Sequence, residues 1–376
     1  MTRIRADWLN GPARHVCAML LQAGHQAWFV GGCVRNALID VPVSDLDLCT
    51  DAQPSRVMAL ANDAGLKVIP TGYDHGTVTV IVQDTPFEIT TFRKDVATDG
   101  RRATVAFAET MIEDARRRDF TMNALYCDVL GEVADPLGGL PDLMARRVRF
   151  IDDADQRIKE DYLRILRFFR FHAWYGDPEG GIDAEGLAAC AENIDGLARV
   201  SRERVTSEML KLLAAPDPGP ALASMGAAGV LGQILAGAAP QIIATLVHVE
   251  EQADLTPDPV RRLVALGGLR DGLRLTNQQE RRIADLLDGQ TLAACAFRHG
   301  ADIATDRAAI EAAGLGREID PDTSEMIRFA AMQTLPIKAA DLMPKLQGAA
   351  LGAALRKAEN DWIASGFQLT RADLLG

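Results

Sequence analysis

Two aspartates, Asp45 and Asp47, lie two residues apart in the run 44–50, which alternates polar and apolar residues as a strand does. Residues two apart on a strand point to the same face of the sheet, so this pattern predicts two carboxylates side by side. Such a pair could share divalent metal ions, which prefer oxygen ligands. The alternative is a solvated strand edge that binds nothing.

A glycine pair, Gly31-Gly32, comes before these aspartates and ends an apolar run that begins at Ala27. Glycine lets the backbone approach a phosphate closely, and the start of the helix that follows favours negative charge. Arg35 on that helix could add a bidentate phosphate contact. A strand, a glycine pair, a helix and two spaced aspartates within twenty residues indicate nucleotidyl transfer, although glycines alone could mark only a turn.

Arginines cluster along the chain, although the net charge is −12 from 40 Lys+Arg and 52 Asp+Glu. The clusters are Arg101-Arg102, Arg116-Arg117-Arg118, Arg146-Arg147, and Arg164, Arg167 and Arg170. An acidic chain disfavours nucleic acid as a partner, yet a basic cleft within an acidic protein would still bind it. The three consecutive arginines repel one another unless an anion lies among them, or unless they form a solvated basic turn.

Asp161 and Arg164 are three residues apart in the segment 155–174, whose apolar residues recur with a helical period. On one helix the two side chains would be neighbours. A carboxylate only accepts hydrogen bonds and a guanidinium only donates them, so the pair matches the Watson–Crick edges of cytosine and adenine and rejects guanine and uracil. The alternative is an ordinary salt bridge within a helix. The same spacing predicts that Arg170 lies far around the helix from Asp161.

Positioning these residues requires a mixed α/β region followed by helices. We predict a helix at 11–23, strands at 27–32 and 44–50, and a hairpin of 75–83 and 86–93 that turns at Asp84-Thr85. Beyond residue 140 strand signals nearly vanish, and helices are predicted at 155–174, at 201–214 and through the Ala- and Leu-rich remainder. Glycines and prolines interrupt the uncharged stretch 218–247, which favours paired short helices over a membrane span.

The composition excludes some classes of protein. A chain that is 48% hydrophobic and 24% charged is not disordered throughout. Its six cysteines form no CxxC pair, which argues against a zinc site of paired cysteines and for a reducing, cytoplasmic location. The first residues lack the apolar core of a signal peptide, so we expect no membrane association.

Five segments resemble, in order and spacing, the class II CCA-adding tRNA nucleotidyltransferases and the related bacterial poly(A) polymerases. They are GGCVRN…SDLDLCT, RRRDFTMNALYCD, DPLGGLPDL, EDYLRILRFFRF and VSRERVTSEMLKLL, within residues 28–214. The resemblance implies an α+β fold, with a nucleotidyltransferase head of the polymerase β type at 1–140. It also implies a helical neck that selects the nucleobase at 141–215, and a helical body and tail that bind tRNA at 216–376.

The same resemblance implies Asp45 and Asp47 as the catalytic residues and Mg²⁺ ligands. The nucleotide-binding residues that it implies are Gly32, Arg35, Arg118, Asp161, Arg164, Arg167 and Arg170. A third metal carboxylate would be Glu88 or Asp119. Residues 94–110 correspond to a flexible loop that the family links to the switch from C to A addition. Asn36 stands where the family usually has Asp, so a helix-capping role would survive there and a charged role would not.

The activity that the resemblance implies is addition of C, C and A to the 3′ end of tRNA from CTP and ATP. Poly(A) polymerase activity and addition of A alone are alternatives within the family, although the run Thr71–Val78 resembles the CCA-adding branch. A non-catalytic RNA-binding protein is the alternative from another class, and the two aspartates argue against it. Protein partners stay open.

Overall fold

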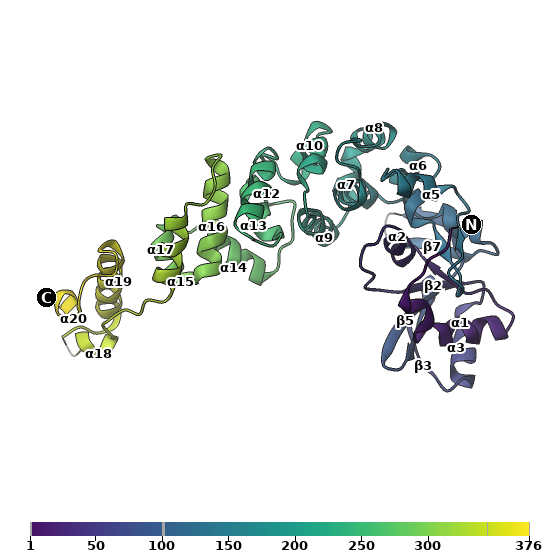
Figure 1. Cartoon of the computed structure of the whole chain (residues 1–376), viewed down its shortest axis with the longest axis horizontal. Helices are drawn as coiled ribbons and strands as arrows, with labels where there is room; N and C mark the ends of the chain where they lie inside the picture. Colours follow the sequence, from purple (N-terminus) through teal and green to yellow (C-terminus); the bar gives the residue numbers. More distant parts are fainter. Residues whose placement is uncertain (1, 100–101, 344, 376) are drawn as a thin grey trace. The chain divides into compact units, whose positions relative to one another are not determined.

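The computed structural model describes residues 2–99, 102–343 and 345–375. By its contacts the chain divides into two compact units, one of residues 1–208 and 220–233 and the other of residues 209–219 and 234–376. The predicted α+β class is confirmed, because the strands precede residue 140 and helices make up the rest (Figure 1). The predicted division into three domains is finer than these two units and stays a prediction. No described helix is long and apolar enough to cross a bilayer.

A mixed sheet forms the centre of the first unit, and seven of the described strands join it in the order β3-β4-β5-β2-β1-β8-β9. These strands are β1 (Trp28–Val30), β2 (Asp47–Thr50), β3 (Lys67–Gly72), β4 (Thr77–Val82), β5 (Thr85–Thr91), β8 (Tyr126–Cys127) and β9 (Val133–Ala134). β2 and β5 run parallel, whereas the other neighbours are antiparallel. The parallel pair matters most here, because it brings together residues far apart in sequence.

A separate two-stranded sheet pairs β6 (Arg93–Asp99) with β7 (Arg102–Phe107). It occupies most of the stretch 94–110 that was predicted as a flexible loop, while Arg101 of the first arginine cluster lies outside the described residues. The predicted hairpin of β4 and β5 is confirmed. Its two-residue turn lies at Gln83 and Asp84, one residue earlier than predicted, and both have positive φ, as a tight hairpin turn requires.

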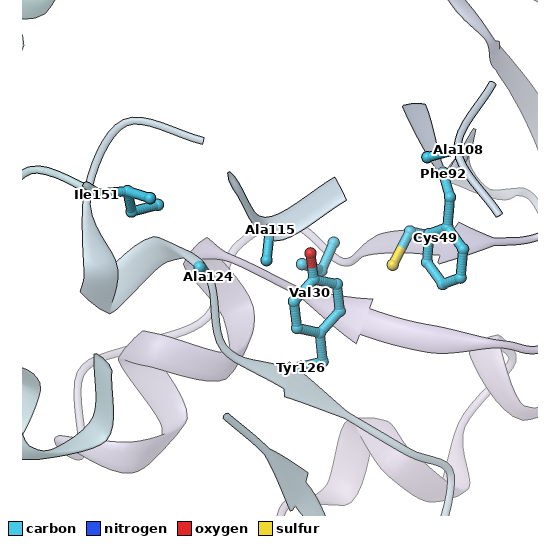
Figure 2. Close-up of a cluster of buried hydrophobic side chains, with 8 residues drawn as sticks. All are labelled: Val30, Cys49, Phe92, Ala108, Ala115, Ala124, Tyr126 and Ile151. Atoms are coloured by element: carbon cyan, nitrogen blue, oxygen red, sulfur yellow. The ribbon is translucent and has the colours of Figure 1, made fainter. Parts of the chain in front are cut away.

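The two faces of the sheet have different neighbours. Helices α1 (Ala13–Gln22) and α3 (Pro54–Asp63) pack on β4 from one side. A buried cluster that includes Cys49, Phe92 and Tyr126 covers part of the other face (Figure 2). Side chains alternate along a strand, so Asp47, two residues before Cys49, projects on the face of this cluster. The hydrophobic packing of the sheet therefore determines the face on which that carboxylate lies.

Helices complete the first unit. They are α2 (Gly32–Leu38), α4 (Met111–Arg116), α5 (Gly139–Met144), α6 (Ala154–Glu160), α7 (Leu163–Tyr175) and α8 (Ala184–Glu192). The predicted helix 155–174 is thus two helices, because the chain turns at residues 161 and 162. The helix predicted at 201–214 is confirmed as α9 (Arg202–Leu213), and the uncharged stretch forms short helices as predicted, beginning with α10 (Gly219–Ala227) and α11 (Val230–Ile234).

The second unit is helical in its described part. Its helices are α12 (Ile242–Gln252), α13 (Pro259–Leu266), α14 (Asn277–Leu286), α15 (Leu292–His299), α16 (Ala301–Gly314), α17 (Pro321–Ala331), α18 (Ala339–Leu342), α19 (Gly348–Ala364) and α20 (Arg371–Leu375). Arg262 is buried among them, where it binds Glu250 and donates to the carbonyls of Leu213 and Pro216. A buried guanidinium with so many acceptors holds the segment that follows α9 in place.

We expect Phe92→Ala to lower the free energy of unfolding by about 3–5 kcal/mol, because it removes a fully buried ring from the cluster of Figure 2 and leaves a cavity. Phe107→Ala is the matched control, since Phe107 is 42% exposed and its truncation should cost less than about 1 kcal/mol. Urea unfolding followed by near-ultraviolet circular dichroism measures both changes. Equal losses in the two variants would contradict the packing described for this cluster.

Candidate active site

Three carboxylates line a cavity of about 630 Å³ at the β2–β5 pair. Asp47 is the first residue of β2 and lies in register with Glu88 of β5, so both side chains leave the same face of the sheet. Asp45 lies in the connection before β2, because the strand begins later than predicted. The prediction that Asp45 and Asp47 both lie on a strand is therefore wrong for Asp45, although both residues line the same cavity.

The charges in this cavity are unbalanced. Partial burial, followed by the negative charge of Glu88, raises the pKa of the Asp47 carboxyl, and Asp45 adds to the shift while Arg118 opposes it. Like charges that oppose each other's ionisation are stabilised by a cation placed between them. The cavity is thus suited to a cationic ligand.

The donor set fits a divalent cation of the magnesium type. Among the described residues, no three carboxylate, imidazole or thiol side chains stand close enough to form a complete metal cage. Mg²⁺ does not require one, because it keeps several waters and is usually held by one or two carboxylates together with substrate phosphates. Asp45 and Asp47 supply two such carboxylates at the rim of one cavity.

Glu88 and Asp119, the two candidates for a third carboxylate, have different surroundings. Glu88 is exposed in the cavity beside Asp47. Asp119 is buried and accepts hydrogen bonds from Asn123 Nδ2 at 2.9 Å and Arg167 Nε at 2.7 Å. Burial alone would raise the pKa of Asp119, but Arg167 and these hydrogen bonds outweigh it and lower the pKa to about 2. Asp119 is therefore occupied by protein partners, whereas Glu88 faces the cavity.

The glycine pair makes the turn between β1 and α2. Gly31 has φ +74°, and a side chain there would meet Arg118 Nη1 at 3.4 Å. Gly32 is the first residue of α2. The turn therefore requires glycine at position 31 for its backbone conformation, and the Arg118 guanidinium lies beside it.

Arg35 is buried, with only 6% of its surface exposed, and binds protein groups. It donates to Asn36 Oδ1, Asn123 Oδ1 and the Tyr175 hydroxyl, and its guanidinium carbon lies 3.9 Å from the centre of the Tyr175 ring. Asn36, which replaces the usual Asp, also donates through Nδ2 to the carbonyl of Pro42. A carboxylate could not make that second bond, so the amide serves the fold here.

The anion among the three consecutive arginines is a side chain of the protein itself. Asp114 is fully buried and accepts from Arg117 Nε at 2.8 Å, Arg118 Nη2 at 3.0 Å and the Tyr126 hydroxyl at 2.8 Å. Burial by itself lowers the pKa of Arg118, but Asp114 outweighs it and raises that pKa. Arg118 is therefore held in one position, beside the Gly31 turn.

Asp161 and Arg164 do not form the predicted pair on one helix. Asp161 follows α6 in an extended conformation, and α7 begins only at Leu163, so the i, i+3 geometry does not apply. The Asp161 carboxylate binds Arg204, with Nη1 to Oδ1 at 3.2 Å and Nη2 to Oδ2 at 2.6 Å. Arg164 binds Glu160 Oε2 and the carbonyls of Arg157 and Arg117. The alternative made from the sequence, a salt bridge between the two within one helix, is therefore wrong, because each side chain has another partner among the described residues. That the two residues read a base stays a prediction.

The remaining two predicted residues, Arg167 and Arg170, lie on α7. Arg170 Nε donates to Glu208 Oε2 at 2.5 Å, and Arg167 binds Asp119 and lies 3.9 Å from Glu208 Oε1. Glu208 is on α9, one turn after Arg204, the residue that binds Asp161. Arg170 and Asp161 are therefore held by neighbouring side chains of one helix, although Arg170 was predicted to lie far from Asp161.

Sequence reasoning assigned no role to Arg204, Glu208, Asp114 or Trp8. Trp8 lines the carboxylate cavity from a short 3₁₀ helix at Asp7–Asn10. Arg204 and Glu208 did carry a signal, because residues four apart on a predicted helix share one face. The default interpretation of that spacing is an ion pair between Arg204 and Glu208 within the helix. That interpretation does not predict their contacts with Asp161 and Arg170. Asp114 carried no signal that separates it from an ordinary helical carboxylate.

Two family profiles match the chain. The Poly A polymerase head domain matches residues 27–149, and the "Probable RNA and SrmB- binding site of polymerase A" matches residues 181–243. The first match contains Gly31, the cavity carboxylates and Arg118. The second match contains α9 with Arg204 and Glu208.

Curated relatives carry related names. The CCA tRNA nucleotidyltransferase 1, mitochondrial, of Homo sapiens is 42% identical over 196 residues, which are 52% of this chain and 45% of the relative. The CCA-adding enzyme of Geobacillus thermodenitrificans is 39% identical over 217 residues, or 57% of this chain and 52% of the relative. The matched region thus spans about half the length of these relatives.

Solved structures extend the likeness over nearly the whole chain. The Bacillus stearothermophilus CCA-adding enzyme in complex with CTP is similar with a TM-score of 0.73 and 27% identity, covering 94% of this chain and 92% of that one. The Thermotoga maritima CCA-adding enzyme complexed with tRNA has a TM-score of 0.68 at 16% identity, covering 100% and 98%. The second likeness concerns the fold alone.

We expect Asp114→Asn to lower the free energy of unfolding by about 3 kcal/mol at pH 7, because it removes the buried carboxylate that pairs with the half-buried Arg117 and Arg118. Burial alone would raise the pKa of Asp114, but Arg118 and Arg117 lower it from 3.8 to about 2. A carboxylate whose pKa falls on folding stabilises above its unfolded pKa, and this contribution is lost as the pH drops through the folded pKa. The difference between wild type and variant should therefore shrink by about 2 kcal/mol between pH 4 and pH 2.

Denaturant unfolding at a series of pH values measures this difference. Asp63→Asn, at an exposed carboxylate that ends α3, is the control and should follow the wild type throughout. A wild type and an Asp114→Asn variant whose stabilities stay parallel from pH 7 to pH 2 would show that the Asp114 ion pairs add nothing on folding.

Proposed function

We propose that this chain, which belongs to the family of class II CCA-adding tRNA nucleotidyltransferases and related poly(A) polymerases, adds C, C and A to the 3′ end of tRNA. CTP and ATP are the substrates, pyrophosphate is released, and no nucleic-acid template is used. The observation that carries the proposal is the cavity that Asp45, Asp47 and Glu88 line together, with no Lys or Arg among its described lining residues. The named relatives support the choice of tRNA over other RNA.

Asp45 and Asp47 would hold Mg²⁺, and the carboxylate next to them in the cavity would be Glu88, because Asp119 is occupied by Arg167 and Asn123. When bound, divalent metal activates the terminal 3′-hydroxyl and stabilises the leaving pyrophosphate. The chain itself supplies charge and position. Its side chains are held by hydrogen bonds before substrate arrives, so little reorganisation is needed during reaction.

The triphosphate would lie along the Gly31-Gly32 turn, where the backbone at Gly32 can approach it closely. Arg118 is the guanidinium nearest to that turn and would contact the phosphates. Arg35 is buried, so we assign to it the task of holding the turn against Asn123 and Tyr175 next to the nucleotide. This differs from the direct phosphate contact that the resemblance implied.

The base would be read by Asp161 and Arg164. Within the described contacts, Arg164 uses three of its five N–H donors for Glu160, Arg157 and Arg117, so Nε–H and one Nη2–H would be available to a ligand. Asp161 accepts the exocyclic amino group that cytosine and adenine share, and Arg164 donates to the neighbouring ring nitrogen. Arg167 and Arg170 complete the pocket from the same helix, α7.

The site of action would be the cytoplasm. All six cysteines are buried and unpaired, as expected in a reducing compartment.

Incubating the protein with tRNA lacking CCA and one nucleotide at a time distinguishes CCA addition from the addition of A alone or of many A residues. Incorporation of CTP would support CCA addition, and incorporation of ATP alone would contradict it.

We expect Asp45→Ala and Asp47→Ala each to reduce nucleotide addition by at least a hundredfold, because each removes a ligand of the metal. Incorporation of radiolabelled CMP into tRNA lacking CCA, with Mg²⁺ supplied, measures the loss. Asp63→Ala, an exposed aspartate outside the cavity, should keep wild-type activity. Circular dichroism should show all three variants folded. Retention of more than a few per cent of activity by either cavity variant would refute the metal assignment.

We expect Asp161→Asn to loosen base selection, because an amide can turn its oxygen to Arg204 and present its N–H to a carbonyl edge. Incorporation of U and G should rise relative to C and A by about ten- to a hundredfold, which corresponds to about 1–3 kcal/mol. The ratios of kcat/KM for the four nucleotides measure this change. Asp155→Asn, which loses an ordinary ion pair with Lys159 on α6, should leave the ratios unchanged. Unmoved ratios in Asp161→Asn would refute the template role.

A further inference from the structure

The side chain that binds the base-reading carboxylate is Arg204 of α9. Its Nη1 lies 3.2 Å from Asp161 Oδ1 and its Nη2 lies 2.6 Å from Oδ2, a fork that engages both oxygens. The backbone N–H of Leu163 also donates to Oδ1 at 3.1 Å. Asp161 is thus held from two directions before any nucleotide is present.

The hydrogen-bond capacity of Asp161 can be counted. An ionised carboxylate offers about four acceptor positions, two on each oxygen. Arg204 occupies one on each oxygen and Leu163 occupies the second on Oδ1. In the described structure one position on Oδ2 is left, and its direction is determined by the other three bonds. A single acceptor in a fixed direction is what one exocyclic amino group of cytosine or adenine requires.

We infer that Arg204 is a specificity-determining positioning residue, which restricts Asp161 to one outward acceptor and so lets the enzyme discriminate amino from carbonyl edges. This inference rests on the proposed function. A freely rotating carboxylate could turn both oxygens toward the pocket and tolerate displaced or water-bridged bases. When uracil or guanine binds, its carbonyl oxygen faces the free acceptor position of the fixed Asp161 carboxylate. Two acceptors then face each other with no hydrogen between them, which strongly disfavours binding in a partly buried site.

Exposure separates this role from a purely structural one. The side chains of Arg204 and Asp161 are 30% and 24% exposed. An ion pair that accessible to water contributes little to folding stability, so its loss should scarcely change the melting temperature. The geometry of the carboxylate, by contrast, depends directly on the guanidinium fork. Nucleotide selection should therefore change much more than stability.

The arrangement on α9 supports the same inference. Glu208 lies one turn after Arg204 on the same face of the helix and binds Arg170, while Arg167 lies 3.9 Å from it. One helix face thus presents a cation to the base-reading carboxylate and a carboxylate to the two pocket arginines. Arg202, at the start of the same helix, is exposed and provides a matched control of equal charge.

The test compares Arg204→Gln, Arg204→Lys and Arg202→Gln in single-nucleotide addition to tRNA lacking CCA. For Arg204→Gln we expect the ratio of kcat/KM for CTP to that for UTP to fall about tenfold, chiefly through a higher KM for CTP. The kcat for CTP should stay within about twofold and the melting temperature within a few degrees. Arg204→Lys should restore part of the ratio, because an ammonium keeps the charge but cannot fork. Arg202→Gln should match the wild type.

A double variant sharpens the result. In an Asp161→Ala background, which has no carboxylate to position, Arg204→Gln should change the CTP to UTP ratio no further. An unchanged ratio in Arg204→Gln, or a lowered melting temperature with all four nucleotides affected equally, would overturn the inference and leave the proposed function standing. A wild-type protein that adds no nucleotide to tRNA would instead overturn the proposed function.

Discussion

The geometry of the site depends on the ion pair between Asp119 and Arg167. Asp119 also accepts from Asn123, Asn123 accepts from Arg35, and Arg35 donates to Tyr175. Arg167 and Tyr175 both lie on α7, so this path begins and ends on one helix and passes through the segment before β8 and through α2. Because each member is buried or half-buried and hydrogen-bonded, α7 has one well-defined position relative to the glycine turn.

The ion pairs of the arginines near the site also affect how this acidic chain can bind an anion. The chain is acidic, with a net charge of −12, and the clustered arginines near the site have carboxylate partners of their own, such as Asp114, Glu160 and Glu208. These paired arginines are therefore held as oriented donors. A polyanion that binds near these arginines would therefore be held more by shape and directed hydrogen bonds than the number of arginines alone would suggest.

The carboxylates of the cavity and the carboxylate of Asp161 differ in the counter-charge that the protein gives them. In the cavity, Asp45, Asp47 and Glu88 place like charges near one another, and partial burial, Glu88 and Asp45 raise the pKa of Asp47 while Arg118 lowers it. At Asp161 the counter-charge is supplied by Arg204, whose two Nη atoms also orient the carboxylate. The proposed roles, metal ligand in the cavity and hydrogen-bond acceptor at Asp161, require this difference in surroundings.

The sequence by itself determined the local elements and the candidates. The β4–β5 hairpin, the strand before Gly31, helix α9 and the residues Asp45 and Asp47 follow from patterns within a few residues. The choice between Glu88 and Asp119 did not, because it depends on the parallel pairing of β2 with β5. Local periodicity even placed Asp161 on a helix with Arg164, whereas Asp161 is extended between α6 and α7 and binds Arg204. Its partner Arg204 lies 43 residues away, and a contact over that distance is decided only when the helices pack.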